Sequence, residues 1–271
     1  MAEFPRKERY DFADLRRMIE VLRGPAGCPW DAAQDHHSVR RNLLEEAYEL
    51  AHAIDAEDED NLKEELGDLM IQVLFHARME EEQGSFGADE VCDAAVKKLL
   101  FRHPHVFGSA EAATPEEALA GWDAAKRIEK KQRSTAEAME GVAESLPALW
   151  RAEKLQSKAA KIGFEWPELS GAIGKIREET EELIEGVAAA DRDNIEEELG
   201  DLLFTVVNAG RMLGVDPEKA LHRACGKYIR RFRFMEETAA GEGKPLETLS
   251  LQEMERYYQR ARHELEGKEM Q

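Results

Sequence analysis

Apolar side chains recur every three or four residues along most of the chain, a spacing that places them on one face of an α-helix. The first such stretch runs from Asp11 to Arg23, and its apolar face consists of Phe12, Leu15, Ile19 and Leu22. No stretch shows the sustained alternation of apolar and polar residues that is typical of a half-buried strand. The pattern therefore predicts an all-α protein.

The later predicted helices are separated by Gly, Pro or short polar segments, which are typical breakers. They span 38–55, 58–82, 89–102, 115 into the basic stretch 126–133, 147–162, 171–189, 191–213, 216–240 and 250–266. GPAGCPWD at 24–31 is predicted to be a loop. Residues 133–146 are small, polar and weakly patterned, so we interpret them as a linker between domains 1–132 and 147–271.

Two acidic stretches, 42–68 and 175–201, match each other without a gap. Glu46 and Glu179 are 133 positions apart, and so are Asp68 and Asp201. A repeat of this length indicates a duplicated structural unit. The sequence therefore predicts two tandem homologous helical bundles.

The repeat extends to a basic pair and an aromatic position. Lys98 and Arg102 recur as Lys227 and Arg231, both 129 positions later. Tyr258 in the last predicted helix falls near the place that Trp122 holds in the first half.

Paired carboxylates are the main candidate chemistry, because residues three or four apart are neighbours on a helix. If neighbouring acidic helices pair antiparallel, their carboxylates converge and repel one another unless a cation binds between them. Hard oxygen ligands favour Mg2+ or Mn2+. Leu199, Leu202 and Val206 lie on the same faces, so we expect some of the carboxylates to approach the core. The candidate metal ligands are Glu179, Glu182, Glu198 and Asp201, with Glu46, Glu49, Glu65 and Asp68 in the first half.

Carboxylates followed by Lys and Arg suit a phosphate compound held through a metal ion. The candidate catalytic carboxylates are Glu178, Glu179 and Glu197, of which Glu178 or Glu197 could orient an attacking water. The second half has Lys175 and Asn208 where the first has Asn42 and Phe75, which favours the second half as the working site. Residues that the pattern leads us to expect at the substrate are Lys175, Lys227, Arg231, Trp166 and Asn208. The alternative is that these side chains form ordinary charged surfaces.

A di-iron bundle also uses Glu from four helices, but it needs Glu-x-x-His on two of them. Glu49 and His52 provide one such motif, and the second half has no counterpart. The sequence therefore disfavours a di-iron centre.

Charge and cysteine content narrow the function further. The formal net charge of −20 over 271 residues disfavours binding to nucleic acid or to an anionic membrane. The three cysteines form no C-x-x-C pair and are odd in number, which fits a reducing cytoplasm. Residues 1–12 have no apolar core of the kind that a signal peptide carries, and no apolar run approaches about 20 residues, so we expect neither a signal peptide nor a membrane span.

Five motifs together resemble the two-domain MazG proteins, which are all-α nucleoside triphosphate pyrophosphohydrolases. They are GCPWD at 27–31, ELGDL at 65–69, RHPHVF at 102–107, SLPAL at 145–149 and ELGDLLF at 198–204. The resemblance covers about residues 10 to 260. It implies Mg2+-dependent hydrolysis of nucleoside triphosphates to the monophosphate and pyrophosphate. It also implies a homodimer.

The resemblance also assigns roles to residues. It implies that Glu179, Glu182, Glu198 and Asp201 hold the metal, and that Lys175, Glu178, Lys227 and Arg231 contact substrate. Tyr258 stands where relatives have Trp, so its contact with the base is an open question. The C-terminal copy is expected to be the main site, with the first copy weakly active, regulatory or structural. A nucleotide-binding regulatory or scaffold protein that does not hydrolyse its ligand is the alternative function, and narrow specificity for dUTP or dCTP also stays open.

Overall fold

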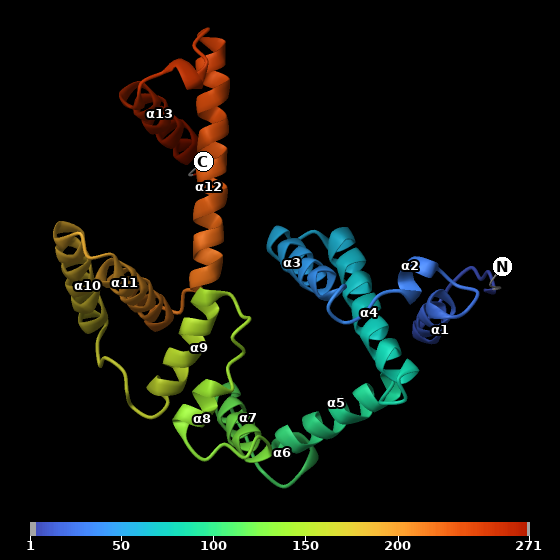
Figure 1. The fold of residues 1–271 in the computed structure, drawn as a ribbon. Helices are drawn as coiled ribbons and strands as arrows, with labels where there is room; N and C mark the ends of the chain where they lie inside the picture. Colours follow the sequence, from blue (N-terminus) through green and yellow to red (C-terminus); the bar gives the residue numbers. More distant parts are fainter. Residues whose placement is uncertain (1–3, 270–271) are drawn as a thin grey trace. The chain divides into compact units, whose positions relative to one another are not determined.

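The computed structural model describes residues 4–269, with side chains to residue 265. Every regular element in that range is a helix, which confirms the predicted all-α class (Figure 1). The chain divides after Lys126 into two compact units. We refer to them as unit 1 and unit 2.

Unit 1 is built on a hairpin of two helices, α3 (Arg40–Ala56) and α4 (Glu59–Glu82), with α1 (Phe12–Arg23) packed against α4. Its core joins these elements through Ile19, Val39, Leu74, Phe75 and Met79. Arg23 pairs with Glu82 at 2.8 Å, which ties the end of α1 to the end of α4. The remaining helices are α2 (Pro29–Ala32), α5 (Ala88–Arg102), α6 (Pro104–Phe107) and most of α7 (Pro115–Glu129), within which the division falls.

Unit 2 repeats the hairpin with α10 (Leu169–Ala189) and α11 (Arg192–Met212), and α9 (Ala148–Ala160) packs against α11. The long α12 (Pro217–Gly241) follows and packs against α13 (Leu251–Glu269) around a small core of Met235, Ala239, Leu246 and Ala261. A short 3-10 turn, η1 (Leu246–Thr248), joins α12 to α13.

The two hairpin turns follow the same local rules. Glu57 and Ala190, 133 positions apart, both adopt the left-handed conformation with φ of 55°. Asp58 and Asp191 come next and cap the following helix, because each side chain accepts a hydrogen bond from the backbone N–H three residues later. The repeat seen in the sequence is therefore a repeat of backbone geometry.

The basic and aromatic helices also correspond between the units. The Arg102 guanidinium lies 5.1 Å from the Trp122 ring centre, and the Arg231 guanidinium lies 5.4 Å from the Tyr258 ring centre. Both arginines are buried. Tyr258 thus packs on its arginine as Trp122 does on the matching one.

Two segments expected to lack regular structure contain short helices. α2 begins at Pro29, within the predicted loop 24–31, and Pro is favoured at the first position of a helix. α8 (Thr135–Glu140) lies within 133–146, the segment interpreted as a linker. Ser134 caps α8, Ala138 is buried, and α8 packs against α9 within unit 2.

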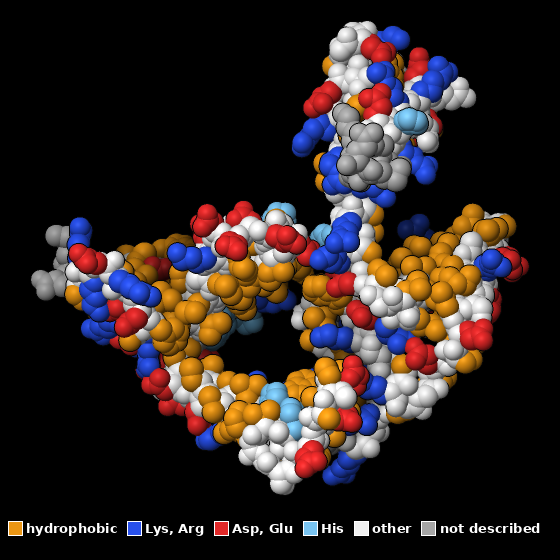
Figure 2. Space-filling model, turned by 180° about the vertical axis from the view of Figure 1, so that it is seen from behind, with side chains coloured by type: hydrophobic (Ala, Val, Ile, Leu, Met, Phe, Trp, Pro, Cys, Tyr) orange, Lys and Arg blue, Asp and Glu red, His pale blue; other side chains and the backbone are white. Residues whose placement is uncertain are grey.

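The expectation that some of the carboxylates approach the core is confirmed, because Glu65 and Glu179 are both buried. The apolar neighbours from which it was argued are mostly exposed. Leu199 and Val206 are both 47 % exposed, and only Leu202 of the three is half-buried. The residues that α11 buries are Thr205, Val207 and Ala209. Hydrophobic side chains remain uncovered over both hairpins (Figure 2). Among the described helices, none combines the length and apolarity required to cross a membrane.

Candidate active site

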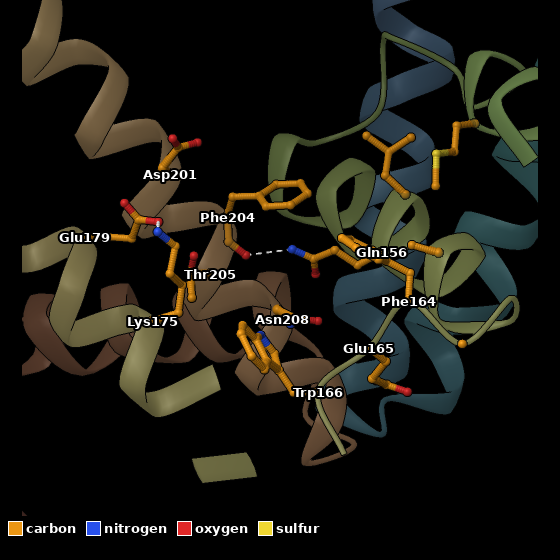
Figure 3. Close-up of a pocket in the computed structure, with 14 residues that line it drawn as sticks. Gln156, Phe164, Glu165, Trp166, Lys175, Glu179, Asp201, Phe204, Thr205 and Asn208 are labelled. Atoms are coloured by element: carbon orange, nitrogen blue, oxygen red, sulfur yellow. Dashed lines mark hydrogen bonds and ion pairs between the residues drawn. The ribbon is translucent and has the colours of Figure 1, made fainter. Parts of the chain in front are cut away.

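Three carboxylates converge where α10 and α11 pair. Glu179, Glu182 and Glu198 each offer one oxygen, and these oxygens all lie within 4.8 Å of one another. Glu179 is buried, with 3 % of its surface exposed, whereas Glu182 and Glu198 are half-buried. Asp201, the fourth expected ligand, lies one turn beyond Glu198 on α11 and faces the adjoining pocket (Figure 3). The arrangement offers only oxygen ligands, as Mg2+ and Mn2+ prefer.

Lys175 supplies a cation beside this cluster. Its Nζ donates to Glu178 and to Glu179, each at 2.7 Å. These hydrogen bonds raise the pKa of Lys175, and the bond from Lys175 lowers the pKa of Glu179. The hydrogen bond between Glu182 and Glu179, together with burial, raises the pKa of Glu182. The protein therefore offsets part of the repulsion among the carboxylates with a side chain of its own.

A partly buried hydrogen bond orients Glu198. The Asn194 side chain donates to Glu198 Oε1 at 3.0 Å. Asn194 can approach α10 only because residue 186 is Gly, since a Cβ at this position would lie 2.4 Å from Asn194 Oδ1. Gly186 therefore makes room for the side chain that holds a carboxylate of the cluster.

A cavity of about 780 Å³ opens directly beside the carboxylates within unit 2. Lys175, Glu179 and Asp201 line one end (Figure 3). The rest is mainly apolar, with Trp166 and a few polar side chains at its wall. The lining of this chamber also includes Leu155, Gln156, Phe164, Phe204, Thr205 and Asn208. A charged end that can hold a cation, joined to an apolar chamber, suits a ligand that has a metal-binding anionic part and a ring system.

Comparison with known proteins agrees with this geometry. The model of the MazG nucleotide pyrophosphohydrolase domain matches the chain twice, at residues 34–107 and 170–234. The chain is 41% identical over 251 residues to the nucleoside triphosphate pyrophosphohydrolase/pyrophosphatase MazG of Thermotoga maritima, covering 93% of this chain and 95% of that protein. It is 40% identical over 253 residues to the nucleoside triphosphate pyrophosphohydrolase of Escherichia coli K12, covering 92% and 96%.

The chain belongs to the MazG family. The family matches span both hairpins, and therefore both sets of carboxylates. Trp166 and Gln156 line the cavity but lie outside the residues matched by the family model. Tyr258 also lies outside the matched residues.

The expected substrate contacts on α12 and α13 lie apart from the lining of the cavity. Lys227 is exposed on α12, and Arg231 donates through Nη1 to the Tyr258 hydroxyl at 3.0 Å. Glu197 is exposed on α11 and, like these three residues, is not part of the cavity wall. Glu178 is exposed and holds Lys175. Lys175, Trp166 and Asn208 do line the cavity.

The MazG copy in unit 1 has a similar carboxylate cluster without a lysine. Glu46, Glu49 and Glu65 bring oxygens within 4.8 Å of one another, and Asp68 is half-buried on α4. Burial, followed by the charges of neighbouring carboxylates, raises the pKa of both Glu46 and Glu65. Glu65 Oε2 is buried with no hydrogen-bond partner among the described residues.

Sequence reasoning missed most of the cavity wall, including Gln156, Phe164, Phe204 and Thr205. One signal was available for Gln156, because it shares helical spacing with the apolar Leu149, Ala152 and Ala159. The structure buries this glutamine on α9. Its Nε2 donates to the Phe204 carbonyl at 2.7 Å, which joins α9 to α11. The other residues look like ordinary apolar or β-branched positions of a helix or loop.

Proposed function

We propose that the protein hydrolyses nucleoside triphosphates between the α- and β-phosphates, giving the monophosphate and pyrophosphate, at the carboxylate cluster of unit 2. The observation that carries the proposal is that one cavity joins the two kinds of surface such a substrate needs. Lys175, Glu179 and Asp201 form its charged end, and Trp166 and Phe164 form part of its apolar wall. Membership in the MazG family and the names of its relatives support the same activity.

The carboxylates of unit 2 fit Mg2+, and Mn2+ would suit the same oxygens. Glu179, Glu182, Glu198 and Asp201 would hold the metal ion. When bound, Mg2+ neutralises phosphate charge and favours the development of negative charge on the leaving pyrophosphate. In unit 1 the corresponding set is Glu46, Glu49, Glu65 and Asp68, and the unpartnered oxygen of Glu65 supports a cation there too.

Other residues of the site bind the substrate or accept a proton from the attacking water. Lys175, released from Glu179, donates hydrogen bonds to a phosphate oxygen. Glu178 accepts a proton from the attacking water and orients it, with Glu197 as the other candidate. Trp166 offers a ring face to the base, and Asn208 contacts the nucleoside. The family resemblance alone supports a phosphate contact for Lys227 and Arg231 and a base contact for Tyr258. None of these three residues lines the cavity.

The assay that tests the proposal separates products after incubation with Mg2+ and single nucleoside triphosphates. We expect the monophosphate and pyrophosphate in equal amounts, and no diphosphate. Calorimetric binding of an intact triphosphate without product would instead support a regulatory or scaffold protein. Nucleoside diphosphate with free phosphate would show that the other anhydride bond is cleaved.

We also propose a homodimer that covers the apolar faces of the hairpins. Leu199, Leu203 and Val206 on α11 are 47 %, 50 % and 47 % exposed. Exposed apolar patches of this kind mark association surfaces. We expect light scattering after size exclusion to give twice the chain mass, and Leu203→Glu to shift the protein toward monomer. Leu251→Glu, at an exposed leucine on α13, serves as the control, and a monomeric wild type would contradict the proposal.

The cellular setting follows from the substrate. Nucleoside triphosphates and Mg2+ are abundant in the cytoplasm, and Cys28, Cys92 and Cys225 are all free thiols. We therefore place the activity there. The net charge of −20 disfavours nucleic acid or a membrane surface as partner. A nucleoside triphosphate can still bind, because a metal ion and Lys175 would neutralise its phosphates locally.

A further inference from the structure

The loop between α9 and α10 carries Trp166 to the cavity and fixes it against α10. Gly163, with φ of +84°, turns the chain at the end of α9. The Trp166 ring then rests on Gly171 in the first turn of α10. A Cβ at residue 171 would lie 2.8 Å from Trp166 Cε3, closer than side chains pack. The ring keeps its present position because residue 171 has no side chain.

Arg211 on α11 holds the same loop from the other side. Its Nη2 donates to the Glu165 carboxylate, the residue before Trp166, and also to Asn208 Oδ1 at 2.8 Å. The Arg211 side chain is only 14% exposed. Arg211 does not itself line the cavity, whereas Glu165, Trp166 and Asn208 all do (Figure 3).

This contact decides which group Asn208 presents to the cavity. Arginine is only a donor, so the oxygen of the Asn208 amide must face it. The NH2 group of Asn208 has no partner among the described residues and remains to donate to a ligand. The nucleoside end of the cavity therefore offers a fixed ring face and an amide donor.

The duplicated hairpin provides an internal comparison. Arg78 occupies the place of Arg211, 133 positions earlier, but it pairs with Glu81 and Glu82 on its own helix. Phe75 and Ser38 stand where unit 2 has Asn208 and Gly171. The arrangement of arginine, amide and loop is thus a property of unit 2 and not of the hairpin as such.

We propose that Arg211 and Gly171 are positioning residues for the nucleoside end of the site. Arg211 sets the Trp166 loop and the Asn208 amide, and Gly171 seats the Trp166 ring. Together they select a planar heterocycle whose edge, or attached sugar, offers a hydrogen-bond acceptor to Asn208. This inference rests on the proposed function, because it takes the charged end of the cavity as the phosphate site.

The experiment separates the nucleoside from the phosphates. Calorimetry in Mg2+ would compare a nucleoside triphosphate bearing a non-hydrolysable α,β-methylene bridge with inorganic tripolyphosphate. We expect Arg211→Met and Gly171→Ala to weaken nucleotide binding about tenfold and to leave tripolyphosphate binding within about twofold of wild type. Arg211→Lys should recover part of the loss, since it can still donate to both partners. Arg78→Met is the matched control and should change neither ligand.

A second measurement needs no ligand. The fluorescence of Trp166, obtained as the difference between each protein and its Trp166→Phe counterpart, should shift to longer wavelength in Arg211→Met as the loop loosens. The inference would be overturned if Arg211→Met weakened the binding of nucleotide and of tripolyphosphate equally. It would also be overturned if Arg211→Met left both nucleotide binding and the Trp166 spectrum unchanged. If wild type binds no nucleotide at all, the proposed function fails, and the spectrum alone decides whether Arg211 holds the loop.

Discussion

Glu179→Gln is expected to lower the rate of pyrophosphate release by about a thousandfold, more than the roughly 10- to 100-fold cost of losing a supporting partner of a metal ligand. Glu179 is the most buried carboxylate of the cluster and the one that Lys175 contacts at 2.7 Å. Glutamine keeps the shape of the side chain but removes the charge that a divalent cation requires. The measurement is the initial rate of pyrophosphate formation with Mg2+ and mixed ribo- and deoxyribonucleoside triphosphates.

Glu46→Gln is the matched control, because Glu46 holds the same place in unit 1. We expect it to retain most of the activity, since unit 1 has Asn42 and Phe75 where unit 2 has Lys175 and Asn208. Loss of activity in Glu46→Gln alone would move catalysis to unit 1. Partial loss in both variants would mean that both copies work.

Lys175→Met should lower kcat/KM by about a hundredfold and at the same time increase the stabilisation that Mg2+ confers. The first effect follows from the loss of a charge-assisted hydrogen bond to phosphate, with misplacement of the neighbouring Glu178. The second follows because Lys175 offsets carboxylate repulsion when no metal is bound. Without it, the metal-free cluster is more strained and gains more from a divalent cation.

The two effects are measured separately. Steady-state kinetics gives kcat/KM, and thermal unfolding with and without Mg2+ gives the shift in Tm. Lys175→Arg keeps the charge, so its Mg2+ response should stay near that of wild type. A Mg2+ response of Lys175→Met no larger than that of wild type would show that the lysine does not compensate the cluster.

The hairpins and the grouping of carboxylates could be predicted from the sequence because they depend on local geometry. Residues three or four apart share a helix face, and the turns at Asp58 and Asp191 carry their own caps. Once each turn forms, Glu179 and Glu198 are brought together with little help from the rest of the chain. The gapless repeat then transfers the same result to Glu46 and Glu65.

The cavity could not be predicted in this way, because it depends on contacts between elements far apart in the sequence. Gln156 and Phe204 lie 48 positions apart and meet only when α9 packs on α11. The pairing of Arg211 with Glu165 likewise spans 46 positions. For Lys227 and Arg231, spacing indicates a shared helix face, but it does not give the distance from that face to the carboxylates.

The contact between Gly186 and Asn194 bears on how duplicated domains diverge. Unit 1 has Asn61 at the place of Asn194 but Ala53 at the place of Gly186. By the geometry of unit 2, an Asn61 side chain placed as Asn194 is would collide with the Ala53 methyl group. Glu65, the counterpart of Glu198, accordingly has a buried oxygen without a hydrogen-bond partner among the described residues. A single methyl group can therefore make two copies unequal while every acidic residue is retained. A comparison of the metal-ligand residues alone would find the two copies equivalent. The difference lies at the position of Gly186 and Ala53, where neither residue has a polar side-chain atom.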